Sequence, residues 1–478
     1  MTADWTLRVP AELMAELEAQ LFPGDGDEHG AVIGASLVST TRGSRLLARR
    51  LFCARDGLDY VPGERGYRML TAAFVRDRAL DCANEGLAYI AVHCHGGRNE
   101  VEFSRDDLAS HERGYPALLD IMDGMPMGGL VFARDAVAGD LWLPGGRRVG
   151  LSYLEVIGRP TRRLRKAPPA RPRAADDRYD RQVRLFGDRG QAILTSQKVG
   201  VIGAGGAGSL LVEYLARLGV GHLVVIDPDR IDPTNLPRVV GSLRRDTRPF
   251  LTGGRLARPL RAVGARLRTP KVNIAERLGR AAQPGIRFDA IFGDVTQPNC
   301  ASRLLDCDHL FLAADTMQAR LVFNAIVHQY LIPGTQLGAK AQVDKRSGEL
   351  LDLFTVVRPV IPGQACLWCN GLISPARLQE EATSPGQRAR QRYVDDDDVR
   401  APSVITLNAM AAANAANDYL MATAGLLESA PLRWTKHYPR TNDVVYESPR
   451  RDERCQECGA QGGRLGAGPL KRLPTAAG

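Results

Sequence analysis

Two histidines separated by a single residue, His93 and His95, are the first side chains in the sequence with an obvious chemical use. Alternate side chains of a β-strand point to one face, so both imidazoles would face one Zn²⁺. Asp107 would supply a third ligand and leave the fourth tetrahedral position to water. Zinc lowers the pKa of the bound water to about 7, and Glu28 would accept the proton that this water loses. The pattern predicts a hydrolytic zinc site, although an H-x-H pair alone is also an ordinary strand sequence.

The order of these residues resembles the JAMM motif of the JAB/MPN metalloprotease family. The motif positions read, in chain order, Glu28, His93, His95, Ser104 and Asp107. The resemblance covers about residues 10–150 and implies that Ser104 stabilises the oxyanion of a tetrahedral intermediate. Two departures stand out: Gly96 replaces the usual Pro, and the spacer before Ser104 is one residue longer. Asp106 therefore remains an alternative ligand to Asp107.

A glycine-rich loop marks a second site. The apolar run 198–202 predicts a strand, and the loop with Gly203, Gly205, Gly206 and Gly208 follows it. A helix through residue 218 and a strand at 223–226 complete a βαβ unit, which predicts a parallel sheet. Backbone amides at the start of such a helix can hold phosphates.

Asp227 ends the second of these strands, where a carboxylate can bind ribose hydroxyls. Nicotinamide dehydrogenases share this arrangement, so an NAD-dependent oxidoreductase with a non-catalytic N-terminal binding module is the alternative interpretation.

Charged and polar residues around the loop favour a nucleoside triphosphate over NAD. They are Arg181 before it and Asp229, Asn235, Arg238, Lys271 and Asp315 after it. Cations offset the charge of a triphosphate, and a carboxylate such as Asp315 can hold Mg²⁺. This set resembles the ThiF/MoeB family, the adenylation domain shared with ubiquitin-activating enzymes, from Arg178 to about Tyr446.

The resemblance implies a role for each position. The four glycines would line the nucleotide, Asp227 would bind ribose, and Asp229 belongs to the same D-x-D motif. Asn235, Arg238 and Lys271 would contact the triphosphate, and Asp315 would position Mg²⁺ and aid adenylation. Arg181 would reach the triphosphate of a neighbouring subunit, which implies a homodimer. The reaction would be attack of a protein C-terminal carboxylate on the α-phosphate of ATP.

Two C-x-x-C pairs form a third group of candidate functional residues: Cys366, Cys369, Cys455 and Cys458. Four thiolates can enclose one Zn²⁺, and a closed Cys₄ site is structural. Such a site would pin the C-terminal segment to the adenylation domain, as is familiar in the ThiF family. A redox pair is the alternative.

Two features depart from the ThiF pattern. The stretch between Arg238 and Lys271 is longer than expected and rich in arginine, which predicts a solvated insertion or, alternatively, a loop that touches the substrate. No cysteine lies between Cys369 and Cys455, where thioester-forming members carry a reactive one. We therefore expect the enzyme to stop at the acyl-adenylate or to pass it to an acceptor elsewhere.

The remaining cysteines are Cys53, Cys82, Cys94, Cys300 and Cys307, for which the interpretation is buried structural thiols.

Composition and the segments rich in Pro or Gly divide the 478 residues into parts. Residues 1–158 are predicted to form the JAB/MPN α/β domain and 177–458 the Rossmann-like adenylation domain with structural zinc. Residues 159–176 read as a basic, Pro-rich linker, and 459–478 as a disordered tail. Much of the net charge of +9 is local to that linker, so nucleic-acid binding is not expected.

The sequence contains neither a long apolar run nor a signal-like start, so a cytoplasmic protein without membrane partners is expected.

The combination predicts ATP, Mg²⁺ and two Zn²⁺ ions, one catalytic and one structural, as cofactors. Adenylation prepares a Gly-Gly C-terminus, and a peptidase could expose that terminus or cleave finished conjugates. The expected partner is therefore a ubiquitin-like or sulfur-carrier protein ending in Gly-Gly. A downstream conjugating enzyme or sulfurtransferase is a further possible partner.

Overall fold

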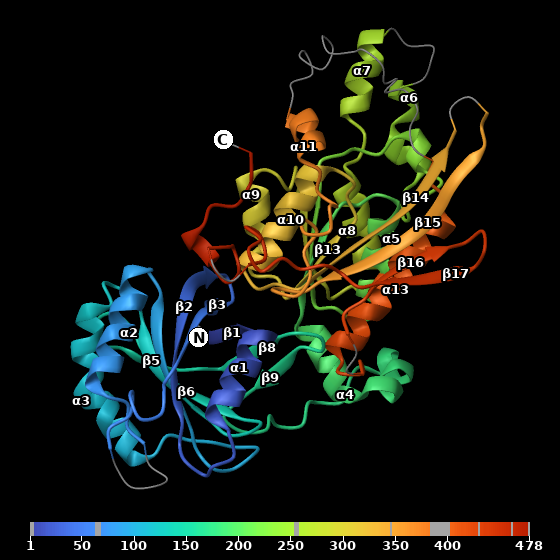
Figure 1. Ribbon diagram of the computed structural model, residues 1–478. Helices are drawn as coiled ribbons and strands as arrows, with labels where there is room; N and C mark the ends of the chain where they lie inside the picture. The colour runs from blue at the N-terminus through green and yellow to red at the C-terminus, as the bar shows by residue number, and fades with distance from the viewer. Residues whose placement is uncertain are drawn as a thin grey trace. The chain divides into compact units, whose positions relative to one another are not determined.

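The computed structural model describes residues 4–62, 68–252, 258–344, 347–382, 402–428, 431–459 and 462–476. The chain divides into two compact units (Figure 1). The first comprises Met1–Arg171 with His328–Leu331 and Glu453–Arg472, and the second comprises Pro172–Val327, Ile332–Asp452 and Leu473–Gly478.

The first unit is built on a nine-stranded mixed sheet within its described residues, in the order β7-β6-β5-β4-β2-β3-β1-β8-β9. Its strands are β1 (Asp4–Pro10), β2 (Gly30–Thr40), β3 (Gly43–Cys53), β4 (Ala88–Cys94), β5 (Met127–Phe132), β6 (Val137–Trp142), β7 (Arg148–Gly150), β8 (Tyr153–Ile157) and β9 (Arg162–Leu164). Its helices are α1 (Ala11–Leu21), α2 (Ala72–Asn84) and α3 (Arg105–Ile121).

Alternation along the central strands explains why helices cover both faces of this sheet. Ile33 of β2 belongs to the core that includes Met14 and Leu17 of α1. Its neighbour Val32 belongs to the core that includes Phe74 of α2. Successive strand side chains point to opposite faces, so a strand that is apolar at every position needs a helix on each side.

The second unit contains an eight-stranded sheet within its described residues, in the order β12-β11-β10-β13-β14-β15-β16-β17. Its strands are β10 (Lys198–Ile202), β11 (His222–Asp227), β12 (Arg287–Phe292), β13 (His309–Leu312), β14 (Gly334–Val343), β15 (Leu350–Val360), β16 (Trp434–Tyr438) and β17 (Asp443–Glu447). The first five in this spatial order are parallel, which agrees with the predicted βαβ unit. The pairs β14–β15, β15–β16 and β16–β17 are antiparallel.

Helices flank this sheet. The longer ones are α4 (Asp180–Ser196), α5 (Gly206–Arg217), α7 (Arg258–Arg266), α8 (Lys271–Ala282), α10 (Met317–Gln329), α11 (Pro375–Ala382) and α13 (Ile405–Thr423), and the short ones are α6 (Pro249–Thr252) and α9 (Pro298–Ala301). Leu211 and Leu215 of α5 share a core with Ala411, Ala412 and other residues of α13. These small alanine side chains let α13 pack closely on α5 near the glycine-rich loop.

Two predicted boundaries differ from the structure. Residues 162–164, assigned to the linker by composition, form β9, because Arg163 Nε donates to the buried carboxylate of Glu155 at 2.8 Å. Residues 462–476, part of the predicted disordered tail, have a defined course. Ser36 Oγ donates to the carbonyl of Gly466 at 2.8 Å, which fixes that glycine in the first unit. Arg163 lies eight residues from its partner Glu155, and Gly466 lies 430 residues from Ser36; composition reveals neither pairing.

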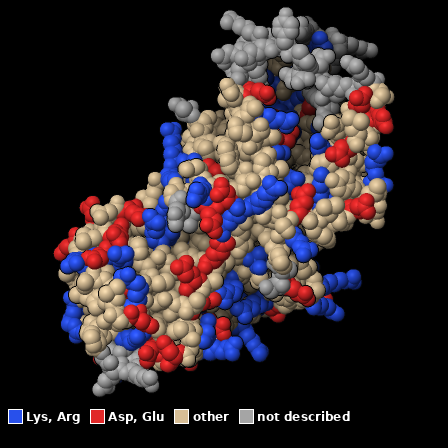
Figure 2. Space-filling model, viewed as in Figure 1, with Lys and Arg blue, Asp and Glu red and all other residues tan. Residues whose placement is uncertain are grey.

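Charge is mixed over the face drawn in Figure 2, where Lys and Arg alternate with Asp and Glu. Among the described residues, no helix combines the length and the apolar character needed to cross a membrane.

Candidate functional sites

The strand register brings the candidate metal ligands of the first unit together. β2 and β4 are antiparallel, and Gly30 lies opposite His93. Glu28, two residues before Gly30, therefore lies near His95, two residues after His93. Glu28 Oε1 is 3.9 Å from His95 Nε2. Asp107 comes from the first turn of α3, which follows β4 in the chain.

The distances among these atoms fit one tetrahedral ion. The Nε2 atoms of His93 and His95 are 3.2 Å apart. The carboxylate of Asp107 lies 3.4 Å from His93 Nε2 and 3.3 Å from His95 Nε2. Zinc–ligand bonds of about 2.0–2.1 Å at tetrahedral angles place ligand atoms about 3.3 Å apart. The three side chains are thus spaced as a zinc ion would require.

The start of α3 selects Asp107 over Asp106 as the third member. Ser104 caps the helix, and its backbone N–H and its Oγ each donate to Asp107 Oδ2 at 2.7 Å. Asp106 is exposed and takes no part in the cluster of His93, His95 and Asp107. The Ser104 hydroxyl therefore orients the Asp107 carboxylate in this structure, and its oxyanion role stays a prediction.

The two carboxylates of this site differ in proton affinity. Burial would raise the pKa of Asp107, but hydrogen bonds with His93 and Ser104 outweigh it and lower that pKa well below its usual range. Burial raises the pKa of Glu28, while the nearby His95 and His93 act in the opposite direction. An ionised Asp107 suits a ligand, and a Glu28 of higher proton affinity suits a proton acceptor.

The nucleotide candidate residues of the second unit gather at a topological switch point. β10 pairs with β11 on one side and with β13 on the other, and all three strands are parallel. Ligands of such sheets bind beyond the carboxyl ends of the strands where the order reverses. The glycine loop follows β10, Asp227 ends β11, and Asp315 follows β13.

Close packing explains the glycines of the loop. A Cβ on Gly208 would lie 1.8 Å from the carbonyl oxygen of Gly203, and Gly203 itself has a φ of +96°. A Cβ on Gly206 would lie 2.2 Å from Nδ2 of Asn408. A Cβ on Gly205 would meet nothing within 4 Å, so this position faces open space that a nucleotide can fill.

Asp227 organises the loop. Its Oδ2 accepts the backbone N–H of Ala204 at 2.7 Å, and its Oδ1 accepts that of Asp229 at 2.8 Å. Burial raises the pKa of Asp227, although Lys271 and these two donors act the other way. The carboxylate therefore holds the glycine loop in place and retains lone pairs for a ribose hydroxyl.

The cations around the loop have defined partners. Lys271, the first residue of α8, places Nζ 2.7 Å from Asp229 Oδ2. Arg238 donates to the carbonyl of Thr234 at 3.1 Å, and Asn235 accepts the N–H of Asp232 at 3.1 Å. Asp315 and Arg181 are both exposed.

Asn408 is a site residue that the sequence did not indicate. It lies on α13, at the end of the stripe of small residues that packs on α5, and is only 7% exposed. Its Nδ2 packs against Gly206 and donates to Ser403 Oγ at 3.2 Å. The one available signal was a single polar residue in phase with Ala411, Ala412 and Ala415.

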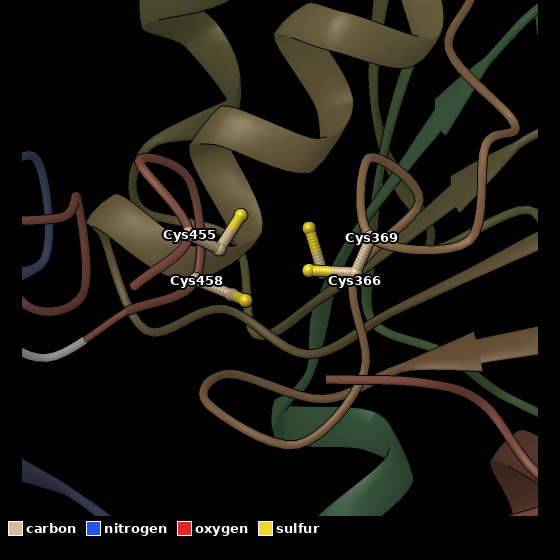
Figure 3. A group of neighbouring side chains, drawn as sticks. All are labelled: Cys366, Cys369, Cys455 and Cys458. Atoms are coloured by element: carbon tan, nitrogen blue, oxygen red, sulfur yellow. The ribbon is translucent and has the colours of Figure 1, made fainter. Parts of the chain in front are cut away.

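The two C-x-x-C pairs converge, as Figure 3 shows. All four Sγ atoms lie within 4.8 Å of one another. Asn324 Nδ2 donates to Cys366 Sγ at 3.5 Å, and the N–H of Glu457 donates to Cys455 Sγ at 3.4 Å. Such donors stabilise thiolates, so the set fits a structural zinc better than two separate redox pairs.

The other cysteines are poorly placed for thioester chemistry. Cys82, Cys94, Cys300 and Cys307 are buried. Burial raises the pKa of Cys82 to about 12 and also raises the pKa of Cys53, Cys94 and Cys300. A thiol that stays protonated is a weak nucleophile.

Comparison with known proteins finds a family match within the second unit. Residues 179–248 match the model of the ThiF family. That segment contains the glycine loop, Asp227, Asn235 and Arg238, and it does not extend to residues 1–158.

Named relatives also match part of the chain. The SAMP-activating enzyme E1 of Haloferax volcanii is 31% identical over 159 residues, which are 33% of this chain and 52% of that protein. The sulfur carrier protein ThiS adenylyltransferase of Bacillus subtilis is 27% identical over 220 residues, 42% of this chain and 56% of that protein. The tRNA threonylcarbamoyladenosine dehydratase of Escherichia coli is 27% identical over 183 residues, 38% of this chain and 61% of that protein. The chain thus spans about half the length of the first two.

Among solved structures, that of Escherichia coli MccB covers 60% of this chain and 76% of its own, with 17% identity and a TM-score of 0.43. A likeness of this size carries no weight in assigning a function.

Replacing His95 with Ala should remove one zinc ion per chain, because the cluster then keeps two ligands. Elemental analysis of purified protein measures this. Asp106→Asn is the matched control and should retain the wild-type zinc content. Equal zinc in the wild type and in the His95→Ala protein would show that these side chains hold no metal.

Replacing Asn408 with Ala should weaken ATP binding about five-fold, equivalent to ~1 kcal/mol, because the glycine loop loses the amide packed against it. Calorimetric titration of ATP measures the change. Asn414→Ala is the control, since Asn414 lies exposed on the same helix. Identical ATP affinity of both variants and the wild type would remove Asn408 from the site.

Proposed function

We propose that the second unit uses ATP to adenylate the C-terminal glycine of a ubiquitin-like or sulfur-carrier protein. The proposal rests on one observation: a glycine loop of the phosphate-binding type lies at the same edge of the sheet as Lys271, Arg238 and Asp315. NAD needs the loop and Asp227, but it does not need these added charges. The named relatives that activate such carriers support the same choice of substrate.

The reaction follows from the charges at this edge. A carboxylate oxygen of the carrier attacks the α-phosphorus, and the bond to the β-phosphate oxygen breaks, so pyrophosphate leaves. Lys271, Arg238 and Asn235 would hold the triphosphate and offset its charge. Asp315 would hold Mg²⁺, which supplies further positive charge on the leaving pyrophosphate. The product is a mixed anhydride with AMP, a far better acyl donor than the carboxylate.

The acyl-adenylate is the end of the reaction on this chain, or it passes to an acceptor on another protein. The raised pKa values of the buried cysteines support this. A conjugating enzyme or a sulfurtransferase would be the next partner. A homodimer would place the exposed Arg181 of one subunit at the triphosphate of its neighbour.

The first unit is proposed to be a zinc-dependent peptidase that acts on the same carrier. Its support is the spacing of His93, His95 and Asp107, together with Glu28 beside His95. Bound zinc would lower the pKa of a coordinated water to about 7. Glu28 would accept the proton of that water and return it to the leaving amine.

The Cys₄ set would hold the second zinc in a closed structural site. ATP, Mg²⁺ and two zinc ions would then serve one chain.

The adenylation proposal is tested by ATP–pyrophosphate exchange with the small Gly-Gly-ended proteins of the host. Asp315→Asn should lower the exchange rate about 100-fold, since one charged group at the reacting phosphates is lost. Asp443→Asn, on exposed strand β17, is the control and should leave the rate unchanged. NAD binding without any exchange would instead favour an oxidoreductase.

The peptidase proposal is tested by cleavage of a carrier extended beyond its Gly-Gly end. Glu28→Gln should abolish cleavage while zinc content and pyrophosphate exchange stay at wild-type levels. Glu100→Gln, at an exposed residue outside the cluster of candidate ligands, serves as the control. Cleavage by Glu28→Gln at the wild-type rate would contradict the assigned role.

A further inference from the structure

The arginine-rich stretch between Arg238 and Lys271 forms an arm on the second unit, with α6 and α7 beside one another (Figure 1). Gly264 of α7 packs on α6, where a Cβ would lie 2.2 Å from the carbonyl oxygen of Leu251. The sequence lists Arg244, Arg245, Arg248, Arg255, Arg258 and Arg261 in this stretch. Arg255 lies outside the described residues. A solvated insertion was one of the two predictions for this arginine-rich stretch.

The base of the arm is fixed beside the nucleotide residues. Asp246 is buried and accepts the N–H of Leu243 at 2.8 Å and Nη2 of Arg277 at 2.7 Å. Its carbonyl accepts the N–H of Thr269 at 3.0 Å, and the carbonyl of Thr269 accepts the N–H of Ile231 at 3.0 Å. The two ends of the arm are therefore hydrogen-bonded to each other at Asp246 and Thr269, two residues before Lys271 and beside the segment that follows Asp227.

The outer part of the arm exposes large apolar side chains. Phe250 is 93% exposed, and Leu260, Val263 and Leu267 are 58%, 55% and 53% exposed. Leu260 and Val263 lie three residues apart in α7 and therefore share one face of that helix, and Leu267 directly follows the helix. A solvated insertion has no need of such residues, and an apolar group of this size commonly marks an interaction site.

The charge of the arm selects the kind of partner. The sequence from Thr247 to Ala275 contains no Asp or Glu, and Arg261 and Arg266 are exposed among the apolar residues. A second copy of the arm would bring like charges together, which is unfavourable. Nucleic acid favours stacking aromatics, and among these exposed apolar side chains Phe250 alone is aromatic. An acidic protein surface with aliphatic residues is the complement that remains.

We propose that this arm docks the folded body of the protein whose C-terminus is adenylated, through an acidic, partly apolar face of that protein. The inference rests on the proposed function. Because the base of the arm adjoins Asp229 and Lys271, a partner held there keeps its tail close to the nucleotide.

The test compares a whole carrier with its tail alone. Pyrophosphate release is measured against the concentration of each Gly-Gly-ended host protein, and against a synthetic peptide of its last six residues. The apolar variant is Phe250→Ser with Leu260→Ser, and the charge variant is Arg261→Glu with Arg266→Glu. Leu58→Ser, at a leucine of the first unit that is 60% exposed, is the control.

Both arm variants should raise KM for the whole carrier about ten-fold or more, as loss of central interface residues does. Their kcat, and their rate with the peptide, should equal those of the wild type and of Leu58→Ser. An unchanged KM for the whole carrier overturns the inference while leaving adenylation standing. A wild type that releases no pyrophosphate with any carrier refutes the proposed function, and the inference with it.

If the arm binds something other than the carrier protein, the arm variants give different results. Dissociation of the dimer in both arm variants would assign the arm to a second copy. Binding of host tRNA or of anionic phosphatidylserine vesicles that the charge variant loses would assign it to nucleic acid or to a membrane. Replacement of the four aspartates at 395–398, which lie outside the described residues, with Asn would lower KM if that acidic run were the occupant. Each of these results overturns the inference.

Discussion

The contact between Gly208 and the carbonyl of Gly203 is the constraint on which the nucleotide site depends. A Cβ at Gly208 would stand 1.8 Å from that oxygen, so α5 can begin this close to the end of β10 only with glycine there. The close approach leaves the amides at the start of α5 facing the space beyond the strands. Asp227 then fixes the loop from the adjacent strand through the N–H of Ala204. Asn408 supports it from α13.

The candidate metal site of the first unit depends on a comparable constraint, the register of two strands and the cap of one helix. Gly30 opposite His93 sets Glu28 near His95. The capping box of α3 directs Asp107 toward both imidazoles. A one-residue shift of β4 against β2 would turn both histidines to the other face of the sheet. The same helix cap that stabilises α3 therefore also sets the position of the third ligand.

Local patterns predicted the elements that carry these sites. The strands predicted at 198–202 and 223–226 correspond to β10 and β11, because their apolar patterns are complete within a few residues. Candidate ligands such as His93, His95 and Asp107 were also evident from spacing. Asn408 was not, because its contact with Gly206 joins residues about 200 positions apart in the chain. The defined course of residues 462–476 escaped prediction for the same reason, since Ser36 holds Gly466.

In the proposed reaction, the α-phosphorus of ATP receives an oxygen from a protein carboxylate. A carrier labelled with ¹⁸O in its C-terminal carboxylate tests it most directly, with hydroxylamine present to take the acyl group by attack at carbon. Mass spectrometry should then find one ¹⁸O in the released AMP and none in pyrophosphate. Label in orthophosphate, or AMP that carries none, would rule out this reaction.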